Sequence, residues 1–316
     1  MPLPAPFQSL RLPVIAAPMF IVSNPELVIA QVRAGIVGSF PALNARPASQ
    51  LDEWLARIAG ETQGCEAPFA VNMIVHRTNP RLEEDLKVLE KWKVPLVITS
   101  LGANAEVNAA VHGWGGIVMH DVIDNTFARK AVDKGADGLI AVAAGAGGHA
   151  GPQSPFALMQ EIRSWFDGPL ALSGSIACGR SILAAQAMGA DFAYIGTPWI
   201  ATPEANAAEA YKQAIVDCGA ADIVYSNLFT GVHGNYLRPS IVAAGMDPDN
   251  LPEGDKSQMN FGSGGNMDAK AWKDIWGAGQ GIGAIRAVEP VADRVEALLA
   301  QYQAAKDELR ARAGMG

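Results

Sequence analysis

A glycine-rich run around one histidine is the segment best suited to chemistry. Residues 145–151 read Gly-Ala-Gly-Gly-His-Ala-Gly, and glycines at a strand end let the backbone approach a bound group closely and present N–H donors. A histidine titrates near neutral pH, so His149 can donate or accept a proton beside a ligand. We predict a catalytic role for His149; the alternative is a histidine that only orders its own loop.

Two other loops are suited to holding an anion. Ser173-Gly174-Ser175 precedes a helix-like segment, and Gly196-Thr197 follows another apolar run. Backbone amides at the start of a helix attract a negative group, and barrel proteins build phosphate sites from two neighbouring loops of this kind. The pair predicts a phosphate site and hence a phosphorylated cofactor, with ordinary turn glycines as the alternative.

Two polar side chains stand near the ends of apolar runs that read as strands. Asn72 lies in the run 69–74, where a buried amide needs hydrogen-bonding partners. The polar edge of a cofactor can supply them, and so can a neighbouring loop. His120 lies in the run 116–122, and the sequence leaves open whether it contacts a cofactor or is a hydrogen-bonded histidine at a strand end.

Strand-like and helix-like segments alternate along the first 200 residues. We expect strands at 14–19, 36–40, 69–74, 96–101, 116–122, 138–144, 170–175 and 192–197. We expect helices at 25–34, 51–59, 81–92, 105–112, 126–134, 156–165 and 180–188.

This order predicts a closed barrel. Helix-like segments end before Gly35, Gly135 and Gly189, and a glycine in this place supplies the left-handed residue that stops a helix. Runs such as 138–142 are apolar without alternation, as in parallel strands covered on both faces. Eight strand–helix units favour an α/β fold of the (β/α)8 TIM barrel type over an open doubly wound sheet, which usually has fewer strands.

The regular pattern stops after Thr197. A helix-like stretch at 205–218 is followed by a region rich in Gly, Asn, Pro and Asp. We predict that residues 1–201 and 268–316 form the barrel, and that 202–267 are an insertion or lid near its mouth, where the loops of barrels surround the ligand. A closing helix is expected over 288–312.

Charge and cysteine usage narrow the classes of partner. The 316 residues hold 24 Lys+Arg and 32 Asp+Glu, a net charge of −8, with no basic run, which argues against nucleic acid. The apolar runs are shorter than the roughly 18–20 residues of a membrane helix, and the first residues show no secretory pattern. We expect a cytoplasmic protein without metal, because its three cysteines form no metal-type cluster. A homo-oligomer is compatible with the sequence.

The motifs resemble the nitronate monooxygenase family, formerly the 2-nitropropane dioxygenases, which are FMN-dependent (β/α)8 barrels. The resemblance covers most of the chain and rests on Ala17-Pro18-Met19, Val71-Asn72, the run 146–151, the run 174–180, Gly196-Thr197, and Gly279-Gln280-Gly281 preceded by Trp276. It implies FMN as cofactor. The implied contacts are Ala17, Pro18, Met19 and Asn72 at the flavin ring, Gly148 and His149 beside flavin and substrate, Gly174, Ser175, Gly196 and Thr197 at the phosphate, and Gln280 closing the site.

The chain departs from this family at several positions. Many relatives have a lysine near the flavin where this chain has His120, and class I members have a catalytic histidine at the end of the fourth strand, where it has Ser100. Serine is not a base by itself, so the resemblance leaves Ser100 as a catalytic residue that hydrogen-bonds substrate or flavin. Ser175 replaces a common glycine, and Asn235 falls where an arginine is frequent.

Three functions follow from the sequence. The leading hypothesis, which the resemblance implies, is an FMN enzyme that oxidises a small-molecule alkyl nitronate with O2 to a carbonyl compound and nitrite. A preformed nitronate needs no proton abstraction, so the absence of a histidine at the end of the fourth strand does not remove this hypothesis. The second is an FMN enzyme that takes hydride from NAD(P)H and reduces a quinone or an enoyl thioester. The third is a phosphate-binding barrel without flavin, such as an aldolase, an isomerase or a ligand binder.

Overall fold

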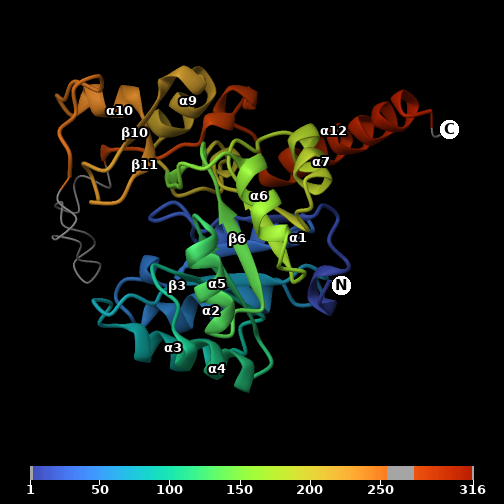
Figure 1. The fold of residues 1–316 in the computed structure, drawn as a ribbon. Helices are drawn as coiled ribbons and strands as arrows, with labels where there is room; N and C mark the ends of the chain where they lie inside the picture. The colour runs from blue at the N-terminus through green and yellow to red at the C-terminus, as the bar shows by residue number, and fades with distance from the viewer. Residues whose placement is uncertain (1–2, 255–273, 315–316) are drawn as a thin grey trace.

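A computed structural model describes residues 3–254 and 274–314 of the chain. Eight parallel strands form a barrel (Figure 1), in the order β1-β9-β8-β6-β5-β4-β3-β2. The strands are β1 (Val14–Ala16), β2 (Gly38–Pro41), β3 (Phe69–Ile74), β4 (Leu96–Ser100), β5 (Ile117–Val122), β6 (Gly138–Val142), β8 (Leu170–Ser173) and β9 (Phe192–Ile195). The Ala16 N–H donates to the Val37 carbonyl at 2.8 Å and closes β1 onto β2. The expected TIM barrel and its eight strands are confirmed.

The seven expected helices cover the outside of the barrel. They are α1 (Pro25–Arg33), α2 (Gln50–Glu61), α3 (Leu82–Lys91), α4 (Ala105–Gly113), α5 (Asn125–Asp133), α6 (Pro155–Arg163) and α7 (Gly179–Ala187). The side chains of Asn24, Asn104 and Asp124 accept hydrogen bonds from the first turns of α1, α4 and α5, which is the usual role of an N-cap. Gly35 and Gly135 have φ of 87° and 91°, as expected for residues that stop a helix.

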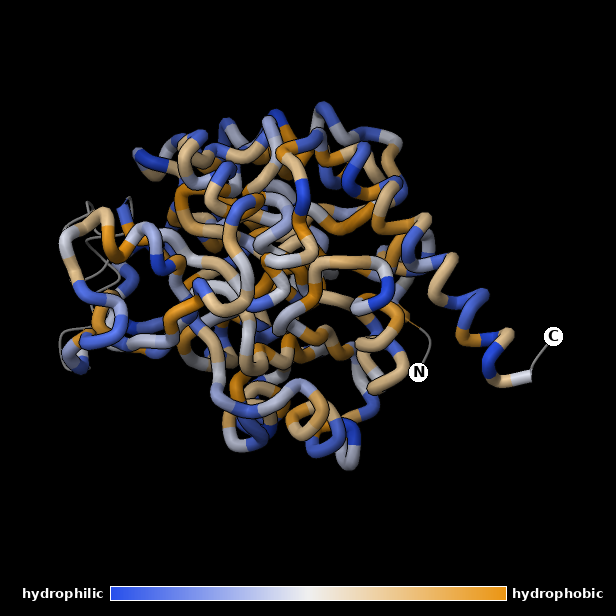
Figure 2. Tube along the Cα trace, turned by 90° about the horizontal axis from the view of Figure 1, so that it is seen from above, coloured by the Kyte–Doolittle hydropathy of each residue, from blue (hydrophilic) through white to orange (hydrophobic). Residues whose placement is uncertain are grey.

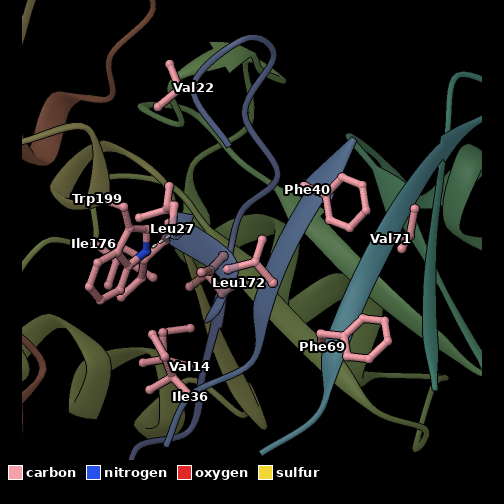
Figure 3. Close-up of a cluster of buried hydrophobic side chains, with 14 of the residues drawn as sticks. Val14, Val22, Leu27, Ile36, Phe40, Phe69, Val71, Leu172, Ile176 and Trp199 are labelled. Carbon is pink, nitrogen blue, oxygen red and sulfur yellow. Dashed lines mark hydrogen bonds between the residues drawn. The ribbon is translucent and has the colours of Figure 1, made fainter. Parts of the chain in front are cut away.

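The core has two layers, and they fix the direction of every strand residue. Inside the barrel lie alternate residues such as Ile98, Met119 and Ile140. Between the strands and the helices lies a larger cluster, part of which Figure 3 shows around Val14, Leu27, Ile36, Leu172 and Trp199. Because successive side chains of a strand point to opposite faces, membership of a layer shows which residues face the interior.

The segment after β9 contributes two strands to a separate small sheet. This segment contains α8 (Thr197–Ile200), α9 (Glu209–Asp217), β10 (Ile223–Ser226), β11 (Gly234–Leu237) and α10 (Arg238–Ala243). Elements α9, β10, β11 and α10 lie together at one end of the molecule, in orange and gold (Figure 1). Strand β11 pairs antiparallel with β10 and with β7 (Gly148–His149). The inserted segment is therefore hydrogen-bonded to the loop that carries His149. Residues 255–267 of the expected insertion and 268–273 of the expected barrel lie outside the described residues.

The chain closes with a long helix, α12 (Val291–Arg312). Its first part packs on α7, where the N–H of Gly179 donates to Gln301 Oε1 at 2.9 Å, and its end extends beyond the barrel in both views (Figures 1 and 2). Short 3-10 helices occur at Ala5–Phe7, Ala42–Asn44, Ala220–Asp222 and Gln280–Ala284. In the described part of the chain, no helix is both long and apolar enough to cross a membrane.

Candidate cofactor site

Backbone segments from four places form a small cavity at the carboxyl ends of β6, β8 and β9. We call this cavity the glycine cradle; it comprises residues 145–147, 173–177, 194–197 and 279–281. The residues that line it are Gly145, Ala146, Gly147, Ser173, Gly174, Ser175, Ile176, Ala177, Tyr194, Gly196, Thr197, Gly279 and Gly281. The predicted phosphate residues are therefore brought together around one cavity.

The cradle has no room for larger side chains on its backbone. A Cβ atom at Gly145 would lie 2.2 Å from Ser175 Oγ, and one at Gly174 would lie 2.8 Å from the Ala144 carbonyl oxygen. Gly174 also has φ of 136°, a conformation that side chains rarely allow. Ser175 has φ of 57° and thus keeps the left-handed geometry that a glycine would adopt there. Walls made of backbone suit a compact anion such as a phosphate.

The segment after β11 closes this cradle. The Gly279 N–H donates to Thr197 Oγ1 at 2.9 Å, and the Gln280 N–H donates to the Gly145 carbonyl at 2.9 Å. Gln280 therefore lies at the cradle, where its backbone serves a structural hydrogen bond; its role toward a cofactor stays a prediction. The start of α7 contributes less than expected, because the Gly179 amide is bonded to Gln301 of α12.

The loop after β1 lies against the same cavity. The Ala17 N–H donates to the Ile195 carbonyl at 2.7 Å, and a Cβ atom at Gly196 would lie 3.5 Å from Ala17 Cβ and 3.6 Å from Met19 Sδ. The Met19 carbonyl accepts a hydrogen bond of 3.0 Å from Asn44 Nδ2. Ala17, Pro18 and Met19 thus form a fixed, half-buried wall beside the cradle.

Across the barrel mouth, three polar side chains are linked by hydrogen bonds. Asn72, Ser100 and Asp121 each stand two residues after an interior core residue of β3, β4 or β5, so their side chains face the barrel interior. Asn72 Nδ2 donates to Ser100 Oγ at 2.7 Å and to the Ile98 carbonyl at 3.0 Å, and Ser100 Oγ donates to Asp121 Oδ2 at 2.5 Å. We call Asn72, Ser100 and Asp121 the polar chain.

These bonds limit what the polar chain can offer a ligand. Both N–H groups of Asn72 are used, so its Oδ1 atom is the group left to meet a donor. The single proton of Ser100 goes to Asp121. The sequence predicted Ser100 as a catalytic residue, but these contacts favour a role in which it links its two neighbours.

Asp121 was not predicted from the sequence. Its Oδ1 atom is buried and has no hydrogen-bond partner among the described residues. Burial raises the pKa of Asp121 to about 6, against the opposing effect of the hydrogen bond from Ser100. The phenol of Tyr194, which lines the cradle, has a pKa raised by burial and then by the charge of Asp121. Asp121 therefore lies within electrostatic reach of a residue that lines the cradle.

His120 points away from the barrel interior. It alternates with Met119 and Asp121, lies between Val118 and Val122 of the helix-facing layer, and is 4% exposed. Its Nδ1 atom is 2.6 Å from Thr99 Oγ1, and burial lowers its pKa to about 4. The prediction that His120 contacts the cofactor assumed an inward side chain, and strand alternation contradicts that assumption. Counting alternate positions from Met119 would have identified Asp121.

His149 lies in β7 and is held by the inserted segment. Its Nε2 atom is 2.9 Å from Thr230 Oγ1, and Thr230 donates its own proton to the Val232 carbonyl at 2.9 Å. This arrangement assigns the imidazole proton to Nε2. Burial lowers the pKa of His149 to about 4, so the ring is neutral at pH 7. Gly148, with φ of 67°, adjoins open space, since a Cβ there would have no atom within 4 Å.

Asn235 stands where the resembled family often has an arginine. It is 2% exposed, and its Nδ2 atom donates to the Ala146 carbonyl at 2.6 Å. The residue therefore fixes the loop between the cradle and His149.

Groups suited to a metal ion are not found in residues 3–254 and 274–314: no three His, Cys, Asp or Glu side chains are placed to hold one. Within these ranges the chemistry of the mouth therefore rests on the cradle, the polar chain and His149.

A parallel eight-stranded barrel with a glycine-lined cavity at the carboxyl ends of its strands is the architecture of a TIM-barrel protein with a ligand site at its mouth. Residues 77–301 match the family model described as nitronate monooxygenase. The chain belongs to the nitronate monooxygenase family and is an oxidoreductase of that family.

The relatives in this family are distant. A nitronate monooxygenase of Paraburkholderia phytofirmans is 26% identical over 96% of this chain and 96% of that protein. The 5-hydroxy-7a-methyl-1-oxo-octahydro-1H-indene-4-carboxyl-CoA dehydrogenase of Rhodococcus jostii is 26% identical over 73% of this chain, and the match spans 64% of that protein.

Solved structures agree on the fold. The nitroalkane oxidase of Streptomyces ansochromogenes superposes with a TM-score of 0.83 and 25% identity, covering 97% of this chain and all of that one. FabK of Thermotoga maritima superposes with a TM-score of 0.78 over 97% of both chains and, at 23% identity, shares the fold.

Proposed function

We propose that this protein is an FMN-dependent oxidoreductase that oxidises alkyl nitronates with O2 to a carbonyl compound and nitrite. One observation carries the proposal. The glycine cradle continues directly into the Gly148-His149 segment, so an anion-binding cavity and a neutral imidazole belong to one loop, in a chain of the nitronate monooxygenase family.

The residues present fit FMN. The cradle excludes side chains and offers backbone to a phosphate, with Gly174, Ser175, Gly196 and Thr197 as its contacts. Ala17 and Met19 lie against Gly196 of the cradle, Gln280 lies beside Gly145, and Gly148 adjoins open space. The proposal adds Pro18 and Asn72 as contacts of the flavin ring. When bound, FMN supplies the electron acceptor that the side chains of this mouth lack. The family match gives the flavin-free aldolase or isomerase no support.

The neutral state of His149 suits a substrate that is already an anion. A nitronate has lost its proton before it binds, so the site needs hydrogen-bond donors and a neutral surround more than a strong base. The pKa of His149, near 4, keeps the imidazole neutral at pH 7, and its contact with Thr230 holds the Gly148-His149 segment against the inserted strand. We assign His149 to positioning the substrate beside this segment.

The test is the visible spectrum of the FMN-loaded protein under nitrogen. We expect the flavin absorbance to fall when propyl nitronate is added, to stay unchanged when NADH or NADPH is added, and to return with air as nitrite appears. Bleaching by NADH or NADPH while nitronate has no effect would contradict the proposal. The parent nitroalkane at neutral pH is the matched control, because it lacks the anion.

A second candidate is the NAD(P)H-dependent reduction of a quinone or an enoyl thioester. The relative from Rhodococcus jostii is named for a CoA thioester substrate, and this keeps thioester chemistry as the alternative. Bleaching by a nicotinamide nucleotide, followed by recovery on adding a quinone or crotonyl-CoA, would support it.

A further inference from the structure

Asp121 carries an acid group at the barrel mouth that the proposed reaction does not yet use. It projects inward from β5, and its Oδ2 atom accepts the hydrogen bond from Ser100. Its Oδ1 atom is buried and makes no hydrogen bond to any described residue. A buried acceptor without a partner costs free energy unless a ligand satisfies it, so this oxygen points to a group that enters the mouth.

The position of Asp121 connects the two walls of the site. Through Ser100 it is linked to Asn72 on β3, and its charge reaches Tyr194 on β9, a residue that lines the cradle. Asp121 is therefore linked both to Asn72, a proposed flavin contact, and to a residue that lines the cradle.

We propose that Asp121 is a cofactor-facing residue that sets how readily bound FMN accepts electrons. Its carboxylate disfavours the extra negative charge of reduced flavin, and protonation of the carboxyl removes that effect. The inference rests on the proposed FMN site. The proton passes between solvent and the carboxyl oxygen, and no bond of the flavin is made or broken by it.

The surroundings of Asp121 leave its charge uncompensated. Strand β4 presents the Ser100 hydroxyl, β6 presents the apolar Ile140 and Val142, and β9 presents the Tyr194 phenol, which is neutral at working pH. Among the residues that the structure describes, Asp121 forms no ion pair of 4 Å or less. The hydrogen bond from the Ser100 hydroxyl is the contact that favours its charged form. Charge near a flavin ring is a principal means by which a protein tunes its potential, so an uncompensated carboxylate here acts on reduction directly.

The experiment compares the midpoint potential of bound FMN in the wild type and in Asp121→Asn at pH 8 and pH 5. Asparagine keeps the shape and removes the charge. At pH 8 we expect D121N to bind reduced FMN, relative to oxidised FMN, about tenfold more tightly than the wild type, which is about 30 mV for two electrons. At pH 5 the carboxyl is protonated, and we expect the difference to fall below about twofold. Because the variants are compared at the same pH, the titration of the flavin itself cancels.

Asp133→Asn is the matched control, because it removes one negative charge from the exposed end of α5 and should leave the potential unchanged. Equal potentials for D121N and wild type at pH 8, or the same shift in D133N, would overturn the inference. So would a D121N shift of equal size at both pH values, since that indicates a rearranged site.

Ser100→Ala is a second variant that keeps the inference testable if D121N does not fold. Loss of the hydroxyl removes the one hydrogen bond that favours the carboxylate. The pH at which the potential changes slope should then move upward from about 6; an unmoved slope would contradict the role of Asp121. Neither measurement uses nitronate, so a protein that binds FMN but does not oxidise nitronates would fail the proposed function and leave this inference intact.

Discussion

The two walls of the barrel mouth are built in different ways. At β6, β8 and β9 the wall is backbone, shaped by glycines at which a Cβ atom would collide with a neighbouring loop. At β3, β4 and β5 the wall consists of the side chains of Asn72, Ser100 and Asp121, which are linked by hydrogen bonds. One carboxyl oxygen of Asp121 has no hydrogen-bond partner among the described residues. We propose that the first wall recognises the shape and negative charge of a phosphate, and that the second adjusts hydrogen bonding and charge at the flavin.

The largest effect is expected where the backbone wall meets the substrate. Replacing His149 with Gln should lower nitronate turnover by about 100-fold, the loss expected when a group that positions the substrate is removed, with FMN affinity unchanged within about threefold. Turnover in the wild type should not follow the titration of His149 between pH 5.5 and 8, because its pKa is about 4. Steady-state kinetics over this range check both points; Thr230→Val, which removes the partner of Nε2, should show an intermediate loss.

The next largest effect is expected at the glycine cradle, and it distinguishes FMN from riboflavin. Gly174→Ala places a Cβ 2.8 Å from a carbonyl oxygen at φ of 136°, a strain of about 1–3 kcal/mol. The dissociation constant of FMN should rise about 10- to 100-fold, and that of riboflavin, which lacks the phosphate, should change by less than about threefold. Gly60→Ala, on the open surface of α2, is the control. Equal losses for FMN and riboflavin would show that the cradle does not recognise phosphate.

His120 gives a prediction about stability rather than binding. Its pKa falls from 6.5 to about 4 on burial, so the folded protein holds fewer protons than the unfolded chain in this window. Stability is therefore fully present above pH 6.5 and is lost as the pH falls toward 4, by about 2 kcal/mol from this residue. Between pH 7 and 4.5, the free energy of unfolding measured with urea should fall by about 2 kcal/mol less in His120→Gln than in the wild type. FMN affinity should stay the same. A tenfold loss of FMN affinity would restore His120 to the site.

The smallest effect concerns the left-handed residue of the cradle. Ser175 has φ of 57°, which costs a residue with a side chain about 1–2 kcal/mol, part of which glycine gives back in unfolded-state entropy. Ser175→Gly should raise the free energy of unfolding by about 0.5 kcal/mol without weakening FMN binding. Ser175→Ala keeps the strain and should bring no such gain, so a stabilised alanine variant would refute this explanation.

The two walls also differ in how far the sequence predicts them. A backbone site depends on glycine positions within short loops, and these are local, so the sequence could place the segments 145–147 and 173–175 at strand ends, where the structure brings them around one cavity. The side-chain wall depends on which of two successive residues faces the interior. One position of error exchanged Asp121 for His120, because both are polar neighbours at the end of one strand.

Other parts of the fold depend on contacts that are remote in sequence. The eight strands follow from local apolar runs, but the pairing of β11 with Gly148-His149 joins segments more than 80 residues apart. The same holds for the Gly179 contact with Gln301, which occupies the helix start that the sequence suggested for an anion. Neither contact has a local signature.

The most direct test of this two-walled site is the affinity of the wild-type apoprotein for FMN and for riboflavin, followed by flavin fluorescence. We predict that FMN binds at least about 100-fold more tightly than riboflavin, because the proposed site holds the phosphate in the glycine cradle. Equal affinities would contradict it and would place the phosphate outside the cradle.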